Sequence, residues 1–390
     1  MLQRLGASTF FCLAALAACA GSVAPEHERV THVAAPLPEA SHEWVELAPQ
    51  PIEIEGRVYD PTCSDAPGAD PAYRFWARRG TLNRLVVYFD GGGACWDDVT
   101  CAVPMLAREG GRSEGFYKAE LLPTDDPRRL SGIFDLDNPR NPVRDWSFVF
   151  VPYCTGDVHS GSNTARYVDP DTGRHYSIQH RGADNFRVVL EWVRANFEAP
   201  EQLLVAGSSA GAYGAATHYA RIRDAFPEAR AAMLGDAGQG VTTSDFLERR
   251  NGNWRYQLPE SVFGANAQLT SDDDIVGSLA SHYPGDRFAQ YTTAHDRTQA
   301  GFYALMGASN ACTAWTERMT HALERRQSAA NFRSYLAAGS SHTILRSPLF
   351  YTEQSGGAPF AEWFAALLDG EPVANRACVN CLAMTEACRF

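Results

Sequence analysis

The sequence has few positive charges and no long apolar run. Its 390 residues include 34 lysines and arginines against 46 aspartates and glutamates, which gives a formal charge of −12. Without a basic stripe, this balance argues against binding to nucleic acid. No segment approaches the roughly 20 consecutive apolar residues that span a bilayer. Internal repeats and low-complexity tracts are also missing, and 45% hydrophobic residues indicate a globular protein with a large core.

The N-terminal residues predict export. A short positive start and an apolar run lead to Leu16-Ala17-Ala18-Cys19, which resembles the lipobox of a bacterial lipoprotein signal. We therefore expect a signal peptide over residues 1–19 with a lipid on Cys19. An ordinary secretory signal cut nearby is the alternative. In either case the mature protein is exported, either lipid-anchored at a bacterial membrane or secreted.

The rest of the chain divides into two parts. Prolines recur over residues 20–50 and predict an extended tether, which leaves residues 51–390 for one folded domain. A lipid on Cys19 is the only membrane contact that we expect. We also expect the protein to be a monomer.

Ten cysteines are many for a protein of a reducing compartment. Cys95 and Cys101 lie close together behind an expected strand and are predicted to form a disulfide. The sequence leaves open how the other six after Cys19 pair: Cys63, Cys154, Cys312, Cys378, Cys381 and Cys388. Cys378-x-x-Cys381 lacks a second closely spaced pair, so we expect no metal site and no cofactor.

Buried β-type runs alternate with helical patterns along the domain. The expected strands are residues 84–90, 146–151, 202–206, 231–235, 288–292 and 332–337. Helical spacing covers residues 186–197 and 211–222. This alternation predicts an α/β fold whose mostly parallel sheet carries helices on both faces.

A candidate nucleophile follows the third of these strands. Gly207-Ser208-Ser209-Ala210-Gly211 has the Gly-x-Ser-x-Gly pattern of a nucleophile elbow, with a strand before it and a helix of small residues after it. The two glycines permit a turn so sharp that Ser209 adopts strained dihedral angles and projects above the sheet. Ser208 is expected to face away from the cleft.

A serine nucleophile needs a histidine base, and that base needs an acid to orient it. In this architecture the order along the chain is serine, acid, histidine. His342 follows the last expected strand and is preferred over His282 and His295. Asp296 and Asp236 each follow a strand between the nucleophile and His342. We favour Asp296 as the acid and expect Asp236 to lie in or behind the pocket.

A glycine run follows the first expected strand. Gly91-Gly92-Gly93 lies where α/β-hydrolases place an oxyanion loop, and Ala210 supplies the N–H of the residue after the nucleophile. No Gly-Lys-Ser/Thr motif follows the run, so a phosphate cradle is not expected.

Together these motifs resemble the pectin acetylesterase and Notum family of carboxylesterases. In addition to His342, the resemblance rests on Phe89–Trp96, Cys101, Gly132–Phe134, Asn138-Pro139, Trp146, Tyr153–Gly161, Gly207–Gly211 and Asp236–Gly238. It implies an α/β-hydrolase fold with Ser209, Asp296 and His342 as the triad. It also implies an oxyanion hole at Gly92, Gly93 and Ala210.

The resemblance further implies that the substrate is an acyl ester, and we expect an O-acetylated carbohydrate polymer. Expected pocket residues are Trp96, Asp157, His159, Tyr213 and Asp236, although Cys154 could instead mark the 153–161 loop as structural. Two alternatives remain open: a lipase or peptidase on the same scaffold, which would act on longer acyl groups or on peptides, and a catalytically inactive surface binding module.

Overall fold

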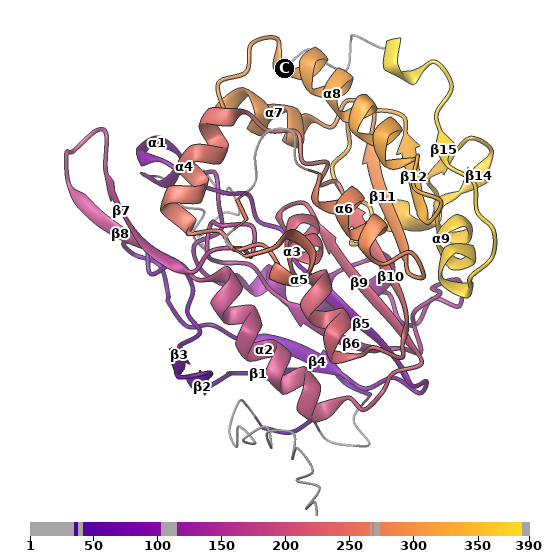
Figure 1. Cartoon of the computed structure of the whole chain (residues 1–390), viewed down its shortest axis with the longest axis horizontal. Coiled ribbons are helices and arrows are strands. Elements are labelled where there is room, and N and C mark those ends of the chain that lie inside the picture. The colour runs from indigo at the N-terminus through magenta and orange to yellow at the C-terminus, as the bar shows by residue number, and fades with distance from the viewer. Residues whose placement is uncertain (1–34, 38–41, 103–114, 266, 269–273, 384–390) are drawn as a thin grey trace, which may run out of the picture. The chain divides into compact units, whose positions relative to one another are not determined.

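A sheet of nine strands forms the centre of the computed structural model (Figure 1), which describes residues 35–37, 42–102, 115–265, 267–268 and 274–383. In spatial order the strands are β1 (Val45–Leu47), β4 (Phe75–Arg78), β6 (Ser147–Val151), β5 (Arg84–Phe89), β9 (Gln202–Ser208), β10 (Arg230–Asp236), β11 (Arg287–Thr293), β12 (Phe332–Ala337) and β15 (Arg376–Ala377). From β6 to β15 every neighbouring pair is parallel, and β1 and β4 are antiparallel at one edge. The predicted mostly parallel sheet is confirmed.

Apolar side chains cover both faces of this sheet. Along β5, Leu85, Val87 and Phe89 belong to one core cluster, while Val86 and Tyr88 belong to another. The helices α2 (Gly182–Asn196) and α3 (Ala210–Ala225) cover the face nearer the viewer in Figure 1. The helix α9 (Phe360–Asp369) packs against the second cluster. Because side chains of a strand alternate between the faces, a continuous apolar run fits a sheet buried on both sides.

Shorter elements complete the described chain. The other α-helices are α1 (Asp98–Ala102), α4 (Ser244–Trp254), α5 (Glu260–Phe263), α6 (Ile275–His282), α7 (Arg297–Leu305) and α8 (Ala311–Arg326). The two-stranded pairs are β2 (Ile52–Ile54) with β3 (Arg57–Tyr59), β7 (Asn163–Val168) with β8 (His175–His180), and β13 (Gln354–Ser355) with β14 (Ala358–Pro359). Short 3₁₀ turns cover Pro123–Asp125, Pro127–Arg129, Gly132–Phe134, Pro348–Tyr351 and Cys381–Ala383.

The folded unit begins earlier than the sequence predicts. The described residues belong to one unit, His32–Phe390. Within the segment expected to be a tether, β1 pairs with β4 in the sheet and Leu37 is 3% exposed. The C-terminal end of residues 20–50 is therefore part of the domain. The expected signal over residues 1–19, including Cys19, lies outside the described residues. In the described part of the chain, no helix is long and apolar enough to cross a membrane.

Disulfides join three pairs of described cysteines. The predicted Cys95–Cys101 bridge is present. Cys63 pairs with Cys154 across 91 residues, and Cys378 pairs with Cys381. Cys312 is also disulfide-bonded. Cys388 lies outside the described residues.

Candidate active site

The turn between β9 and α3 has the predicted elbow geometry. Ser209 lies between the two elements with φ 57° and ψ −124°, values that a non-glycine residue rarely adopts. A Cβ atom at Gly207 would lie 2.1 Å from the carbonyl oxygen of Gly211, and one at Gly211 would lie 2.0 Å from that of Phe89. Only glycine fits at these positions, so the backbone itself holds Ser209 at the N-terminus of α3.

The two neighbouring serines have different surroundings. Ser208 is buried, donates a hydrogen bond of 2.5 Å to Asp236 Oδ2 and accepts one of 2.8 Å from Tyr88. Ser209 is half-buried and lines an open pocket. The geometry therefore leaves Ser209, and not Ser208, available to a substrate.

His342 and Asp296 meet above the ends of two adjacent parallel strands, β11 and β12. The imidazole Nδ1 lies 2.8 Å from Asp296 Oδ2 and 3.0 Å from Oδ1. Asp296 is fully buried, caps the N-terminus of α7 and accepts two hydrogen bonds from Gln299, one from its N–H and one from its amide. A carboxylate on Nδ1 places the proton there and leaves Nε2 as the acceptor.

His342 and Ser209 line the same pocket, but the structure contains no hydrogen bond between them. Among the described residues, no polar atom forms a hydrogen bond with His342 Nε2. Such contacts are often long without a substrate. The structure thus brings the three expected residues to one site, and their catalytic roles stay a prediction.

The rival histidines lie elsewhere. His295 is buried, with Nδ1 3.1 Å from the Thr316 hydroxyl and Nε2 3.0 Å from the Cys381 carbonyl oxygen. His282 is the last residue of α6. Neither lines the pocket.

Asp236 does not line the pocket but lies behind it, where it supports the segment that carries His342. It is fully buried and accepts hydrogen bonds of 3.0 Å from the N–H groups of Ile344 and Leu345, in addition to the one from Ser208. Burial raises the pKa of this carboxyl. Asp236 therefore connects the elbow to the backbone just after His342.

The glycine run packs directly against the elbow. A Cβ atom at Gly91 would lie 2.8 Å from that of Ser209. Gly93 has φ 75° and lies opposite Tyr117 in an antiparallel bridge. In this bridge the Ala94 N–H donates to the Phe116 carbonyl oxygen, and the Lys118 N–H donates to the Gly92 carbonyl oxygen. The N–H of Gly93 is not used in that pairing. Gly93, Ala94 and Ala210 line the pocket, whereas Gly92 does not.

Buried charges lie behind this loop. Asp90 accepts a hydrogen bond of 2.7 Å from Lys118 and a short one from Arg346, and Lys118 lies 2.6 Å from Asp125. Burial alone raises the pKa of Asp90, but the charges of Arg346 and Lys118 outweigh it and hold the pKa below its usual value. The cluster therefore connects Asp90, directly before the glycine run, to Arg346, four positions after His342.

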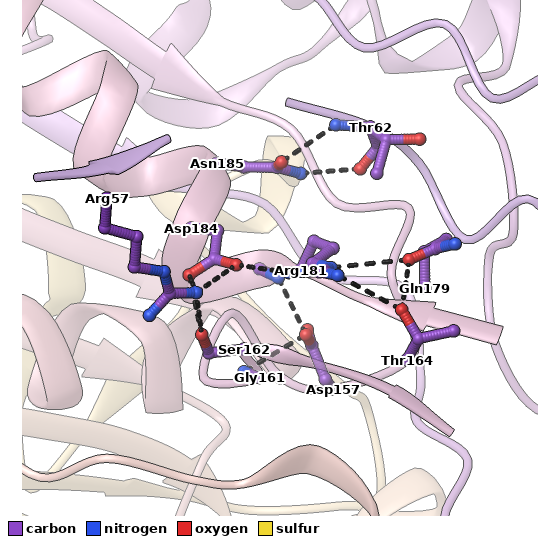
Figure 2. Close-up of polar contacts among 11 residues, drawn as sticks. Arg57, Thr62, Asp157, Gly161, Ser162, Thr164, Gln179, Arg181, Asp184 and Asn185 are labelled. Atoms are coloured by element: carbon purple, nitrogen blue, oxygen red, sulfur yellow. Dashed lines mark hydrogen bonds and ion pairs between the residues drawn. The ribbon is translucent and has the colours of Figure 1, made fainter. Parts of the chain in front are cut away.

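Three more residues expected in the pocket are structural instead. Asp157 is fully buried and accepts hydrogen bonds from Thr155 and from the N–H groups of His159, Gly161 and Gly182. Figure 2 shows its carboxylate beside Gly161, close to the polar group formed by Arg57, Ser162, Arg181 and Asp184. His159 contacts the Asp90 carbonyl oxygen at 2.8 Å. Trp96 packs edge-on against Phe246 and is 2% exposed.

Part of the pocket wall comes from helices that carried no motif. Tyr213 is the one expected substrate-contacting residue that lines it. Val158, from the 153–161 loop, also lines it. The remaining side chains at the pocket belong to no motif named above: Val241, Thr242, Phe246, Arg250, Thr298, Gln299, Phe302, Met306 and Trp315. Most are apolar, so the pocket combines apolar walls with one cation.

One group of potential metal ligands occurs among the described residues, formed by Cys95, Cys101 and His180. Both sulfurs belong to the Cys95–Cys101 disulfide, and only a thiolate binds a metal strongly. The group has no role in the chemistry of Ser209.

A comparison with protein families shows which family the chain is related to. The pectinacetylesterase family model matches residues 54–282, more than half of the chain. The chain belongs to the pectinacetylesterase family. Among its relatives, pectin acetylesterase 11 of Arabidopsis thaliana is 29% identical over 182 residues, which cover 46% of this chain and 43% of the relative. The palmitoleoyl-protein carboxylesterase Notum of Schmidtea mediterranea is 25% identical over 167 residues, 41% of this chain and 28% of the relative.

These matches cover less than half of each relative's own length. In three dimensions, this pectinacetylesterase-family chain is similar to the solved Wnt deacylase Notum from Drosophila, with a TM-score of 0.58 at 16% identity. That likeness covers 82% of this chain and 93% of the other. It confirms the α/β-hydrolase-like fold.

Proposed function

We propose that this protein is an exported serine carboxylesterase that removes short O-acyl groups, acetyl above all, from a carbohydrate polymer through an acyl-enzyme on Ser209. The observation that carries the proposal is the contact between Asp296 and the Nδ1 atom of His342 beside the pocket of the elbow serine. A buried carboxylate in this position orients the imidazole and stabilises the imidazolium that forms during catalysis.

In the proposed reaction, Ser209 Oγ attacks the carbonyl carbon of the ester while His342 Nε2 takes the hydroxyl proton. The oxyanion accepts hydrogen bonds from backbone N–H groups. Gly93 and Ala210 are the best candidates because both line the pocket, and the N–H of Ala210 belongs to the first turn of a helix, which has no partner within it. His342 then gives its proton to the leaving alcohol oxygen as the C–O bond breaks.

In the second half of the reaction, water attacks the acyl-enzyme. His342 Nε2 accepts a proton from the water, and the new oxyanion uses the same donors. The C–O bond to Ser209 breaks, the serine oxygen regains a proton from His342, and the carboxylic acid leaves. No cofactor enters this scheme.

Family membership and the name of the plant relative favour acetyl as the acyl group. The apolar pocket walls favour a second candidate, an esterase for longer acyl chains. A panel of 4-nitrophenyl esters of rising chain length separates the two, because a short pocket loses kcat/KM beyond two to four carbons. A flat or rising profile would favour the second candidate.

Disulfides favour export, since they persist in oxidising compartments. The same proposal includes the signal over residues 1–19 and a lipid on Cys19. Metabolic labelling with a radioactive fatty acid, compared between the natural protein and Cys19→Ala, tests the lipid separately from the activity.

Labelling with a fluorophosphonate probe tests the nucleophile. We expect Ser209→Ala to abolish both labelling and ester turnover while the melting temperature changes little. Ser208→Ala is the matched control: it removes a hydrogen bond to Asp236 but leaves the elbow serine, so labelling should persist. A Ser209→Ala protein that still reacts with the probe overturns the assignment. A natural protein that turns over no ester would support the inactive binding module.

A further inference from the structure

One cation that lines the pocket has no acidic partner in the described part of the chain. Arg250 lies on α4, lines the same pocket as Ser209 and is 5% exposed. Among the residues that the structure describes, no aspartate or glutamate forms an ion pair with it. Its Nε is buried without a hydrogen bond, and Nη2 contacts only the side-chain oxygen of the adjacent Asn251, at 3.1 Å.

Two other arginines of the chain pair with aspartates. Arg326, 6% exposed, lies 2.7 Å from Asp274 Oδ1 and donates to the side-chain oxygen of Gln290 and the carbonyl oxygen of Gln239. The guanidinium of Arg346 donates to Asp90. Arg250 differs from both, because its remaining N–H groups have no acceptor that the structure describes.

Aromatic rings hold the guanidinium in place. Its Cζ lies 4.1 Å from the ring centre of Tyr256, 5.8 Å from that of Phe246 and 5.9 Å from that of Trp254. Cation–π contacts reduce the cost of burying the charge but satisfy none of the hydrogen-bond donors. Arg250 therefore has a fixed position and unused donors.

We propose that Arg250 determines specificity by binding a carboxylate of the substrate next to the ester that Ser209 attacks. The inference rests on the proposed esterase function and names a substrate class for it: anionic esters. A planar guanidinium pairs well with a carboxylate, and the apolar walls strengthen such a contact by excluding water. The carboxylate belongs either to the acyl group or to the alcohol part of the ester.

Two pairs of esters distinguish these sources. For the acyl part, the mono-4-nitrophenyl ester of adipic acid is compared with 4-nitrophenyl hexanoate, which has the same number of acyl carbons. For the alcohol part, 3-acetoxybenzoate is compared with its methyl ester. In at least one pair we expect the natural protein to prefer the anionic ester, and Arg250→Met to reduce that preference roughly 10- to 100-fold, the effect of losing a hydrogen bond between charged groups.

The control variant is Arg221→Met, which removes another buried guanidinium with an unsatisfied N–H that does not line the pocket. It should leave the charge preference unchanged. Arg250→Lys should retain part of the preference and covers the case in which Arg250→Met does not fold.

The natural protein alone can overturn the inference. If it hydrolyses the neutral esters but shows no charge preference in either pair, Arg250 binds no substrate carboxylate and the proposed esterase function stands. If it hydrolyses no ester of either kind, the esterase proposal itself fails. An equal loss of preference in Arg221→Met and Arg250→Met also contradicts the proposal.

Discussion

Two buried aspartates contact different parts of the segment that carries His342. Asp296 reaches the imidazole, while Asp236 binds the backbone N–H groups of Ile344 and Leu345. One carboxylate can therefore set the proton position of the base, and the other can only set the position of its loop. Changing each to asparagine separates these effects.

Asp296→Asn should lower kcat by about 10³ to 10⁴, because an amide in place of the carboxylate favours the wrong imidazole tautomer. The melting temperature should fall less than in Asp236→Asn, since the amide oxygen can still accept the hydrogen bond that caps α7 and only the bond from the Gln299 side chain is lost. Rates of 4-nitrophenyl acetate hydrolysis and thermal melts measure the two quantities. An Asp296→Asn enzyme with nearly full kcat contradicts the assignment.

Asp236→Asn is the comparison variant and should show the opposite pattern. Its amide would place N–H groups against the donors of Ser208 and Leu345, which costs stability on the order of 1 to 3 kcal/mol. We expect a lower melting temperature and a smaller loss of kcat than in Asp296→Asn. The reverse order of the two kcat losses would make Asp236 the acid.

Sequence patterns predicted the three residues that the structure brings to one site, but not every pocket residue. Ser209, Asp296 and His342 follow strand ends, and parallel strands bring those ends to one edge. Asp157 and His159 also follow a strand end, yet both are buried and bind backbone groups. A polar residue on a loop gives the same sequence signal whether it faces the pocket or the chain, and only tertiary packing decides.

At the scale of elements, the sheet was predictable and the pocket walls were not. Strands such as β5 and β9 are continuous apolar runs, which a sheet covered on both faces requires. Six of the residues that line the pocket come from α4, α7 and α8: Phe246, Arg250, Thr298, Gln299, Phe302 and Trp315. Which face of a helix meets the pocket depends on how these helices pack, so nothing in the sequence singled out Phe246 or Arg250.

The disulfides should differ in what they stabilise. By loop length, Cys63–Cys154 is expected to contribute about 4 to 5 kcal/mol and Cys95–Cys101 about 2 kcal/mol. The shorter bridge, however, follows the glycine loop directly. We expect Cys95→Ala/Cys101→Ala to lower kcat more than stability, and Cys63→Ala/Cys154→Ala to lower the urea midpoint more. Alkylation of the unreduced, denatured natural protein checks that both bridges form.

The charge cluster behind the glycine loop leads to a separate prediction about the free energy of unfolding. Lys118 is the only lysine of the chain and its side chain is 9% exposed. Lys118→Met leaves Asp125 buried without its cation and should cost about 3 to 5 kcal/mol. Lys118→Met/Asp125→Leu should recover part of this, because Asp90 keeps Arg346. Urea unfolding of both variants tests it, and a double variant less stable than the single one contradicts the pairing.

Across the whole molecule, several ionisable groups are buried in their neutral forms. Burial lowers the pKa of His159 and of His180 to about 4, and lowers that of His218 well below its usual value. Asp157 has the opposite shift, since burial raises its pKa to about 6. These shifts connect the stability of the fold to pH.

The buried imidazoles should make the stability fall as the pH decreases from about 7 to 5. Unfolded histidine has a pKa near 6.5, so below that pH the unfolded chain binds protons that the folded one does not, and each of His159 and His180 loses roughly 1 to 2 kcal/mol of its contribution by pH 5. Carboxyls whose pKa burial raises act in the opposite direction, because their folded forms bind the extra proton, and they offset part of the loss: Asp125, Asp157, Asp236 and Glu353. Urea unfolding at pH 7 and pH 5 measures the difference. His180→Gln should reduce this fall in stability, because it removes one of the imidazoles, and an equal pH dependence in His180→Gln and the natural protein would contradict the lowered pKa of His180.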